Sequence, residues 1–424
     1  MLITLDHLRR FTVARNFFTP TTLRRAFHRM GFVQADPIRA PARAQDLILR
    51  HRVKNYHAGD LERRYATLDI EEDIFVNYGF VTSSLHELMH PRGYSRVSAE
   101  DGLAWPAAQK KKAQLLLEFV RERGAVHPRE VDEHFSHGTV TNYWGGSSNA
   151  TTHLLDAMHY RGLLRVARRE KGIRIYVVHQ HEPAPEGAEP APGAKPEFKK
   201  QLAAGRSLRR TSGGRAEAQN DAAERQALID ALVDVRARID GLVDVVVRIY
   251  APLPGPSFSY FVRRLRYAVP QWQRELTSAL LRAKERLSHA RVDGVDWYWA
   301  ADEDAMVHGG AATECRPHKL PHDTVRLLAP FDPLVHDRAR FEMLWGWGYR
   351  FEAYTPAAKR KLGYYAMPLL WRDHVIGWGN LSVKNGELLP ELGYVESRPP
   401  RDRAFTRELK AELDRMRSFL GLEC

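Results

Sequence analysis

The sequence has few cysteines and no long apolar run. Its two cysteines, Cys315 and Cys424, stand in a chain of 424 residues, which is too few for a disulfide scaffold and fits a reducing compartment. No stretch approaches the roughly 18 consecutive apolar residues of a membrane-spanning helix. The first twenty residues carry polar side chains where a signal peptide would have its apolar core. These absences predict a cytoplasmic protein with no membrane partner.

Acidic residues are in the minority. The chain has 64 Lys and Arg against 52 Asp and Glu, a net charge of +12. Such a surplus favours a polyanionic partner, because Lys and Arg bound to phosphates release condensed counterions. The alternative is a charge spread evenly over the surface that only aids solubility. The length allows two to four domains with cores of their own.

Residues 109–178 have the clearest pattern. An amphipathic segment ends at Gly124, a second begins at Pro128, and a third ends at Gly162; each has the apolar spacing and the end signals of a helix. Two alternating stretches follow, separated at residues 170–172, and predict a β-hairpin. Three short helices and a hairpin predict a winged helix, that is, a helix-turn-helix with a wing.

The same order is expected twice more, so the fold class predicted is α+β, with tandem winged-helix (helix-turn-helix) domains and a β-rich C-terminal domain. A stretch rich in Pro, Ala and Gly predicts a mobile basic linker. Aromatic segments that alternate as strands do, followed by an amphipathic helix, close the chain. The expected domains are a winged-helix-like domain at 1–105, a winged helix at 106–181, the linker at 182–220, a third winged-helix-like domain at 221–312 and the β-rich domain at 313–424.

Gln34 and Asp36 are the candidate catalytic pair. In a strand through residues 32–37 they lie on one face, two residues apart, so that a carboxamide and a carboxylate point into one space. Hydrolysis of an N-glycosidic bond can use this pair: the carboxylate stabilises positive charge on the sugar and the Gln orients water. By spacing alone, the favoured interpretation is the simpler one, a strand end at which Asp36 caps the turn before Pro37.

The segments around this pair resemble those of a known family. Residues 31–53 and 60–80 are similar to the winged-helix DNA glycosylases of the AlkZ/YcaQ family, and so are residues 242–253, 293–300, 327–338 and 350–371. The family's signature is Gln, an apolar residue, then Gln or Asp. Gln34-Ala35-Asp36 matches the YcaQ-like Gln-x-Asp branch, with Ala35 smaller than the usual branched aliphatic residue.

The resemblance implies a monofunctional DNA glycosylase that excises bulky or crosslinked N-alkylated purines from duplex DNA and leaves an abasic site. Gln34 would position the water, and Asp36 would stabilise the sugar cation or act as a base. No metal, other cofactor or covalent lysine intermediate is expected, and the protein is expected to act as a monomer associated with the nucleoid. The alternative function is a winged-helix regulator or repair scaffold without catalysis. Whether the lesion is flipped out of the duplex stays open.

Two groups of basic residues are predicted to contact DNA phosphates. One follows the catalytic motif and consists of Arg39, Arg43, Arg50 and Arg52; the other lies on the wing of the second domain and consists of Arg165, Arg168, Arg169, Lys171 and Arg174. For each residue of the first group, a surface or structural role is an equal alternative.

A second motif suggests different chemistry. Residues 86–90, His-Glu-Leu-Met-His, fit the H-E-x-x-H pattern of zinc proteases, in which both His bind zinc and Glu87 is the general base. Pro91, however, directly follows His90 and disfavours helical geometry there. No patterned third ligand follows either. The sequence therefore predicts that this protein is not a zinc protease.

Overall fold

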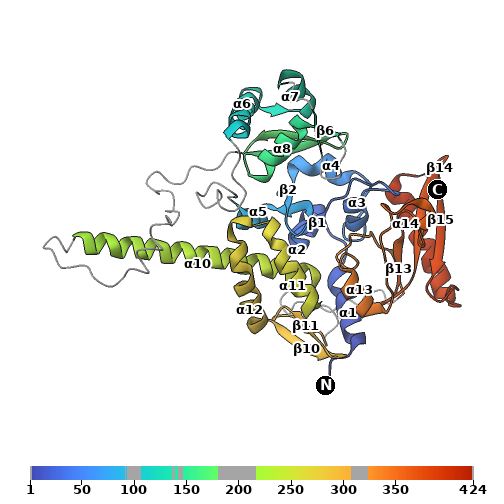
Figure 1. The fold of residues 1–424 in the computed structure, drawn as a ribbon. Helices are drawn as coiled ribbons and strands as arrows, with labels where there is room; N and C mark the ends of the chain where they lie inside the picture. Colours follow the sequence, from blue (N-terminus) through green and yellow to red (C-terminus); the bar gives the residue numbers. More distant parts are fainter. Residues whose placement is uncertain are drawn as a thin grey trace.

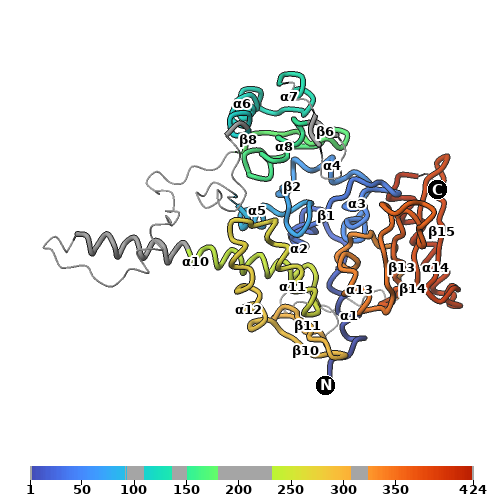
Figure 2. Tube along the Cα trace, viewed as in Figure 1, coloured from blue at the N-terminus to red at the C-terminus, as the bar shows by residue number. Residues whose placement is uncertain are grey.

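The chain forms four closely packed parts (Figures 1 and 2), described here from a computed structural model. Both cysteines and residues 182–215 of the predicted linker lie outside the described residues. The structure describes residues 2–90, 92, 107–135, 139–141, 147–179, 216–306 and 323–422. Among the helices within these ranges, none is long and apolar enough to cross a membrane.

The first part has the element order that the sequence predicts. Thr22 caps the second helix by accepting a hydrogen bond from the Arg25 amide, as its position before the apolar run indicates. The three strands form one antiparallel sheet in the order β1-β3-β2. The elements are α1 (Leu5–Asn16), α2 (Leu23–Met30), β1 (Phe32–Gln34), α3 (Ala44–Leu49), α4 (Asp60–Arg64), β2 (Ile70–Ile74), β3 (Tyr78–Thr82) and α5 (Ser83–Met89).

The second part shares with the first the order helix, strand, helix, helix and hairpin, with two short strands, β5 and β6, between its second and third helices. Its three-stranded sheet is arranged β4-β8-β7. Lys171 and Gly172 both have positive φ, 50° and 88°, and form the two-residue turn of the predicted wing. The elements are α6 (Ala107–Arg123), β4 (Ala125–Val126), α7 (Pro128–Phe135), β5 (Thr139–Thr141), β6 (Ser147–Asn149), α8 (Ala150–Tyr160), β7 (Leu164–Glu170) and β8 (Ile173–Val178).

The third part has the same order again, with its sheet arranged β10-β11-β9. Its first helix begins at Ala216, inside the range predicted as linker, so the linker prediction extended five residues too far. The elements are α10 (Ala216–Tyr250), β9 (Leu253–Pro254), α11 (Gly255–Arg264), α12 (Leu276–Arg286), β10 (Ser288–Val292) and β11 (Val295–Trp299). Three copies of helix, strand, helix, helix and hairpin therefore precede the last part.

The last part is rich in strands, as predicted, and has a four-stranded antiparallel sheet in the order β12-β13-β14-β15. The prediction of strand structure at residues 343–356 was wrong: residues 343–345 end a helix that Asp337 caps through the Arg340 amide, and residues 346–356 form no strand. Trp347 and Trp378 stack on each other, with ring centroids 5.7 Å apart, and pack, partly buried, against a third apolar cluster. The elements are β12 (Val325–Leu327), α13 (Arg338–Trp345), β13 (Met367–Trp371), β14 (His374–Lys384), β15 (Glu387–Tyr394) and α14 (Arg403–Leu420).

Short 3₁₀ turns connect several of these elements. They lie at η1 (Tyr65–Thr67), η3 (Leu265–Tyr267), η4 (Pro270–Glu275) and η5 (Ala357–Lys359). Two large apolar cores cross the borders between the parts. One joins the first and second parts to the C-terminal sheet, and the other joins the first part to α10, α11 and α12. The first part therefore lies at the centre of the molecule (Figure 2).

Candidate active site

Strand β1 lies between the two large cores. Phe32 packs in the core that contains α10 and α11, whereas Val33 packs in the core shared with the C-terminal sheet. Because strand side chains alternate, Gln34 faces the same side as Phe32. Gln34 pairs with Gly79 of β3, where a Cβ atom would lie 2.4 Å from the Val33 carbonyl oxygen. Only glycine permits this close approach, so Gly79 fixes the position of the strand that carries the candidate pair.

A chain of hydrogen bonds orients the Gln34 side chain. The Asn77 Nδ2 group, in the turn between β2 and β3, donates to Gln34 Oε1 at 3.1 Å. Arg264 of α11 donates from Nη2 to Asn77 Oδ1 at 2.6 Å and from Nε to the Val76 carbonyl at 2.6 Å. His336 Nε2 lies 3.4 Å from Asn77 Nδ2. With its oxygen engaged, Gln34 has its Nε2 hydrogens available to donate to a water.

Asp36 is buried but keeps one carboxylate oxygen for chemistry. Its Oδ1 accepts a hydrogen bond from the Ile38 amide at 2.9 Å, and its own amide donates to Gln45 Oε1 at 3.3 Å. Within the described part of the chain, no hydrogen bond reaches Oδ2. Burial raises the pKa of Asp36 above its ordinary value of 3.8, and the Ile38 hydrogen bond opposes that rise. Asp36 therefore caps the turn through Oδ1, and its second oxygen is compatible with the catalytic interpretation, which stays a prediction.

The C-terminal part contributes two tyrosines to the surroundings of Asp36. Burial raises the pKa of Tyr365, and the negative charge of Asp36 is the next cause. The same two causes raise the pKa of the exposed Tyr354. The Tyr365 hydroxyl is buried, and among the described residues it has no hydrogen-bond partner. Two tyrosines from the C-terminal part therefore lie near enough to Asp36 for its charge to raise their pKa.

The fold uses three of the predicted phosphate ligands internally. The guanidinium of Arg52, 1% exposed, donates to both carboxylate oxygens of Asp332 at 2.8 and 3.0 Å. Arg50 pairs with the buried Glu412, and Arg43 pairs with Glu62 at 2.8 Å. The prediction that these three bind phosphate does not fit such positions, because each charge already has a carboxylate partner. Arg39, the fourth residue of this group, is exposed.

Two arginines of the wing also form ion pairs within the molecule. Arg169 of β7 donates from Nε and Nη2 to the two oxygens of Glu72, both at 2.6 Å, and the Glu72 side chain is fully buried. Burial alone would raise the pKa of Glu72, but the Arg169 guanidinium holds it below its usual value. Arg174 pairs with Asp156 at 3.0 Å and lies over the Tyr78 ring. These contacts dock the wing on the first part instead of leaving it free for DNA.

The remaining wing cations lie at the surface. Arg165 pairs with Glu71 at 3.1 Å, and its side chain is half exposed. Arg168 pairs with Glu170, two residues further along the same strand, and is also half exposed. Lys171, at the tip of the wing, is exposed. Of the nine residues predicted to contact DNA, four therefore lie with their charge accessible at the surface: Arg39, Arg165, Arg168 and Lys171.

Sequence reasoning missed the residues that support the pair. Asn77, His336, Tyr354 and Tyr365 all lie in segments that carried the family resemblance, which was the one signal that could have found them. Arg264 lies outside those segments. None shows a local motif, because their relation to Gln34 and Asp36 arises only when distant parts of the chain pack together.

Comparison with known proteins identifies the class. The protein is a DNA glycosylase, an enzyme whose partner is DNA: the family model described as AlkZ-like DNA glycosylase matches residues 27–419. The chain belongs to the AlkZ-like DNA glycosylase family. Among solved structures, it is similar to the Streptomyces sahachiroi DNA glycosylase AlkZ, with a TM-score of 0.56 and 12% sequence identity, over 100% of this chain and 98% of that one. At this identity, the structural likeness supports the shared fold.

Proposed function

We propose that the protein hydrolyses the N-glycosidic bond of bulky or crosslinked N-alkylated purines in duplex DNA and leaves an abasic site. Gln34 and Asp36 perform the chemistry. The observation that carries this proposal is their placement on and just after β1, both 9% exposed, with one amide group and one carboxylate oxygen that form no hydrogen bond among the described residues. Gln34 donates to a water, and Asp36 Oδ2 accepts from it.

The reaction needs little more than this pair when the leaving base is already cationic. The bond between C1′ and the purine nitrogen breaks, and its electron pair neutralises the base. Water then bonds to C1′ and gives its proton to Asp36 Oδ2. A carboxylate about 4 Å from the developing sugar cation contributes roughly 4 kcal/mol at an effective dielectric constant near 20. That energy corresponds to about a thousandfold in rate.

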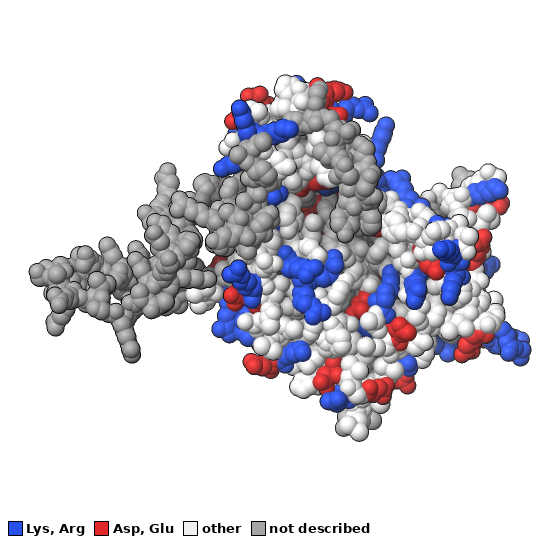
Figure 3. Space-filling model, viewed as in Figure 1, with Lys and Arg blue, Asp and Glu red and all other residues white. Residues whose placement is uncertain are grey.

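Duplex binding in this proposal uses the surface cations. Arg39, Arg168 and Lys171 contact phosphates, together with Lys and Arg side chains gathered on the face shown in Figure 3. Apart from the linker, which ends before Ala216, the proposed domains keep the boundaries predicted from the sequence. Three successive winged helices can follow a duplex without a second copy of the chain, so the protein acts as a monomer on the nucleoid.

The test is single-turnover base release from duplexes that carry N7-alkylguanine adducts of increasing size and a nitrogen-mustard crosslink. Asp36→Asn should lower the release rate about a thousandfold, because it removes the charge that stabilises the sugar cation. Duplex affinity should change little. Asp69→Asn removes an exposed carboxylate from the same part of the chain and serves as the matched control, with release expected at the wild-type rate.

Two outcomes would count against the proposal. If Asp36→Asn and wild type release the same adduct at equal rates, the chemistry lies elsewhere. If wild type binds these duplexes tightly but releases none of the adducts, the substrate class is wrong. In that case the protein acts on another lesion, or serves as a winged-helix scaffold.

A further inference from the structure

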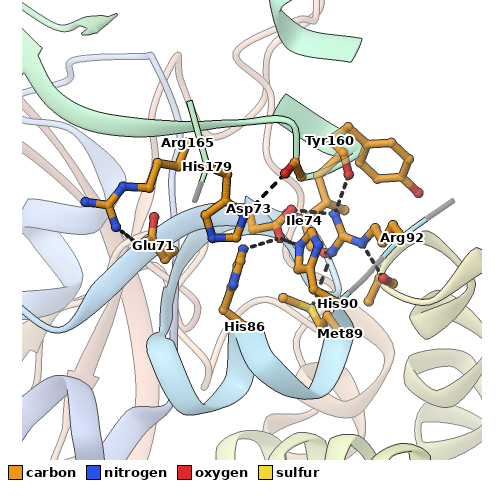
Figure 4. Close-up of polar contacts among 12 residues, drawn as sticks. Glu71, Asp73, Ile74, His86, Met89, His90, Arg92, Tyr160, Arg165 and His179 are labelled. Atoms are coloured by element: carbon orange, nitrogen blue, oxygen red, sulfur yellow. Dashed lines mark hydrogen bonds and ion pairs between the residues drawn. The ribbon is translucent and has the colours of Figure 1, made fainter. Parts of the chain in front are cut away.

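The H-E-x-x-H segment forms a buried cluster in the structure, although its geometry is not that of a protease. His86 lies within α5, while His90 is its C-cap, with φ −105° and ψ 156°. This extended conformation agrees with the expectation from Pro91. Glu87 is exposed, whereas both imidazoles turn toward Asp73 (Figure 4). The general base of a zinc protease is therefore not beside the two histidines.

Three ligand atoms converge in this cluster. His90 Nε2 lies 2.8 Å and His86 Nε2 lies 3.5 Å from the same oxygen, Oδ2 of Asp73 on β2. The two imidazoles stack with centroids 4.0 Å apart, and the three ligand atoms all lie within 4.8 Å of one another. Donor atoms on a tetrahedral zinc ion are about 3.3 Å apart, given zinc bonds of roughly 2.0–2.2 Å. The spacing is close to that of a metal site.

The surroundings hold these side chains in place. The Asp73 and His90 side chains are only 3% and 7% exposed. Arg92 donates to the other carboxylate oxygen of Asp73, Oδ1, at 2.6 Å, which orients the carboxylate and leaves Oδ2 toward the histidines. Fixed outer partners of this kind are typical of metal ligands.

A third imidazole lies beside the cluster. The His179 ring, just after β8, is 5.6 Å from the ring of His86 and 6.5 Å from that of His90. Its Nδ1 lies 3.2 Å from the Gly162 carbonyl oxygen, a contact that fixes the ring plane. Figure 4 shows the three imidazoles grouped around Asp73. A change of side-chain rotamer, with loss of the Gly162 contact, would let His179 supply a fourth donor.

We propose that Asp73, His86 and His90 bind one divalent transition-metal ion of the zinc class, with His179 as the fourth ligand. The ion has a structural role, because it joins two parts of the chain: Asp73, His86 and His90 belong to the first part and His179 to the second. Arg238 of α10, in the third part, holds the same segment by donating to the carbonyl oxygens of Glu87 and His90 at 2.7 and 3.1 Å. One carboxylate and three imidazoles suit zinc or cobalt and not magnesium or calcium.

The experiment measures metal binding by the full-length protein, apart from base release. Protein freed of metal by a chelator is dialysed against Zn²⁺, and bound zinc is counted by mass spectrometry. Wild type should bind one equivalent and unfold at a higher temperature with zinc than without it. Co²⁺ in place of zinc should give the visible absorption of a tetrahedral site. His86→Asn should weaken zinc binding by about a hundredfold or more, because one ligand is lost.

Two further variants make the result decisive. His374→Asn removes a surface histidine that pairs with Asp373 at 2.8 Å; it should bind zinc as wild type does. His86→Cys restores a zinc ligand, so it should recover binding and add a thiolate-to-cobalt charge-transfer band. Wild type that binds no more zinc than His86→Asn would overturn the proposal. So would zinc binding that depends on His374. Neither readout depends on glycosylase activity, so this proposal and the proposed function can fail separately.

Discussion

At the scale of single residues, each side chain of the candidate pair uses one polar group in a hydrogen bond within the protein and has a second polar group left for substrate. Asp36 uses Oδ1 to cap the turn at Ile38 and keeps Oδ2 for substrate. The Oε1 atom of Gln34 accepts a hydrogen bond from Asn77, and its Nε2 hydrogens remain for a water. Ala35 between them donates its amide to the Tyr78 carbonyl at 3.1 Å, which continues the strand pairing beyond β1. The backbone is therefore held close to each of the two candidate side chains.

The burial of Asp36 predicts the pH dependence of base release. The reaction needs the ionised carboxylate, and the rate therefore falls as the pH drops through the pKa of Asp36. Because burial raises this pKa above 3.8, the midpoint of the acid limb should lie above that of an ordinary aspartate. Single-turnover rates between about pH 4 and pH 8 would measure it, with circular dichroism to follow folding. A midpoint at or below 3.8 in folded protein would contradict the assignment of Asp36.

At the scale of elements, the wing of the second part acts as a docking hairpin. Its strand β7 packs against β2 of the first part, and Arg169 and Glu72 form a bidentate ion pair at their contact. The Tyr78 hydroxyl also donates to Glu72. A winged helix usually offers its wing to DNA, but here Arg169 and Arg174 of the hairpin are paired with carboxylates, and Arg165, Arg168 and Lys171 remain accessible at the surface.

Two substitutions separate the docking and DNA-binding roles of the wing. Arg169→Ala should destabilise the protein by about 3–5 kcal/mol, because it leaves the buried Glu72 charge without a partner. Lys171→Ala should leave stability unchanged and reduce the salt dependence of duplex binding by about one phosphate contact. Thermal unfolding and fluorescence anisotropy over a salt series measure the two effects. A stable Arg169→Ala variant with a reduced salt slope would restore Arg169 as a phosphate ligand.

At the scale of the whole molecule, the C-terminal part completes the site built on the first part. Buried ion pairs join the two, Arg52 with Asp332 and Arg50 with Glu412. Tyr365 lies near Asp36, and His336 lies beside the Asn77 amide. The shape of the site therefore depends on how firmly the two parts are held together.

Breaking one of these buried pairs should affect stability and activity together. Asp332→Asn leaves the Arg52 charge buried without its counterion, and we expect a loss of about 3–5 kcal/mol in the free energy of unfolding. Base release should slow as well, because Tyr354 and Tyr365 would shift relative to Asp36. Denaturant unfolding and single-turnover kinetics measure both. Asp323→Asn breaks the exposed pair with Arg372 and should cost at most about 1 kcal/mol. Equal effects of the two substitutions would show that burial does not decide the outcome.

The sequence alone determined the features that depend on local pattern. Helix periods and end signals such as Gly124 and Pro128 predicted the helices of the second part, and the resemblance around residues 31–53 predicted the glycosylase family and drew attention to Gln34 and Asp36. These signals are local, since an end signal, a period or a motif involves residues close together in the chain. The strand structure expected of the aromatic residues at 343–356 is absent, because aromatic residues suit strands and other packed segments alike.

Only the tertiary structure decided which charges are free and which groups meet. Nothing near Arg52 in the sequence shows that Asp332 neutralises it, and nothing near His86 shows that Asp73 lies opposite. The sequence predicted phosphate contacts for arginines that the fold pairs with carboxylates, because a charge looks the same in the sequence whether it is buried or exposed. The partner of a buried charge is chosen by packing between distant segments, and that choice exists only in the folded chain.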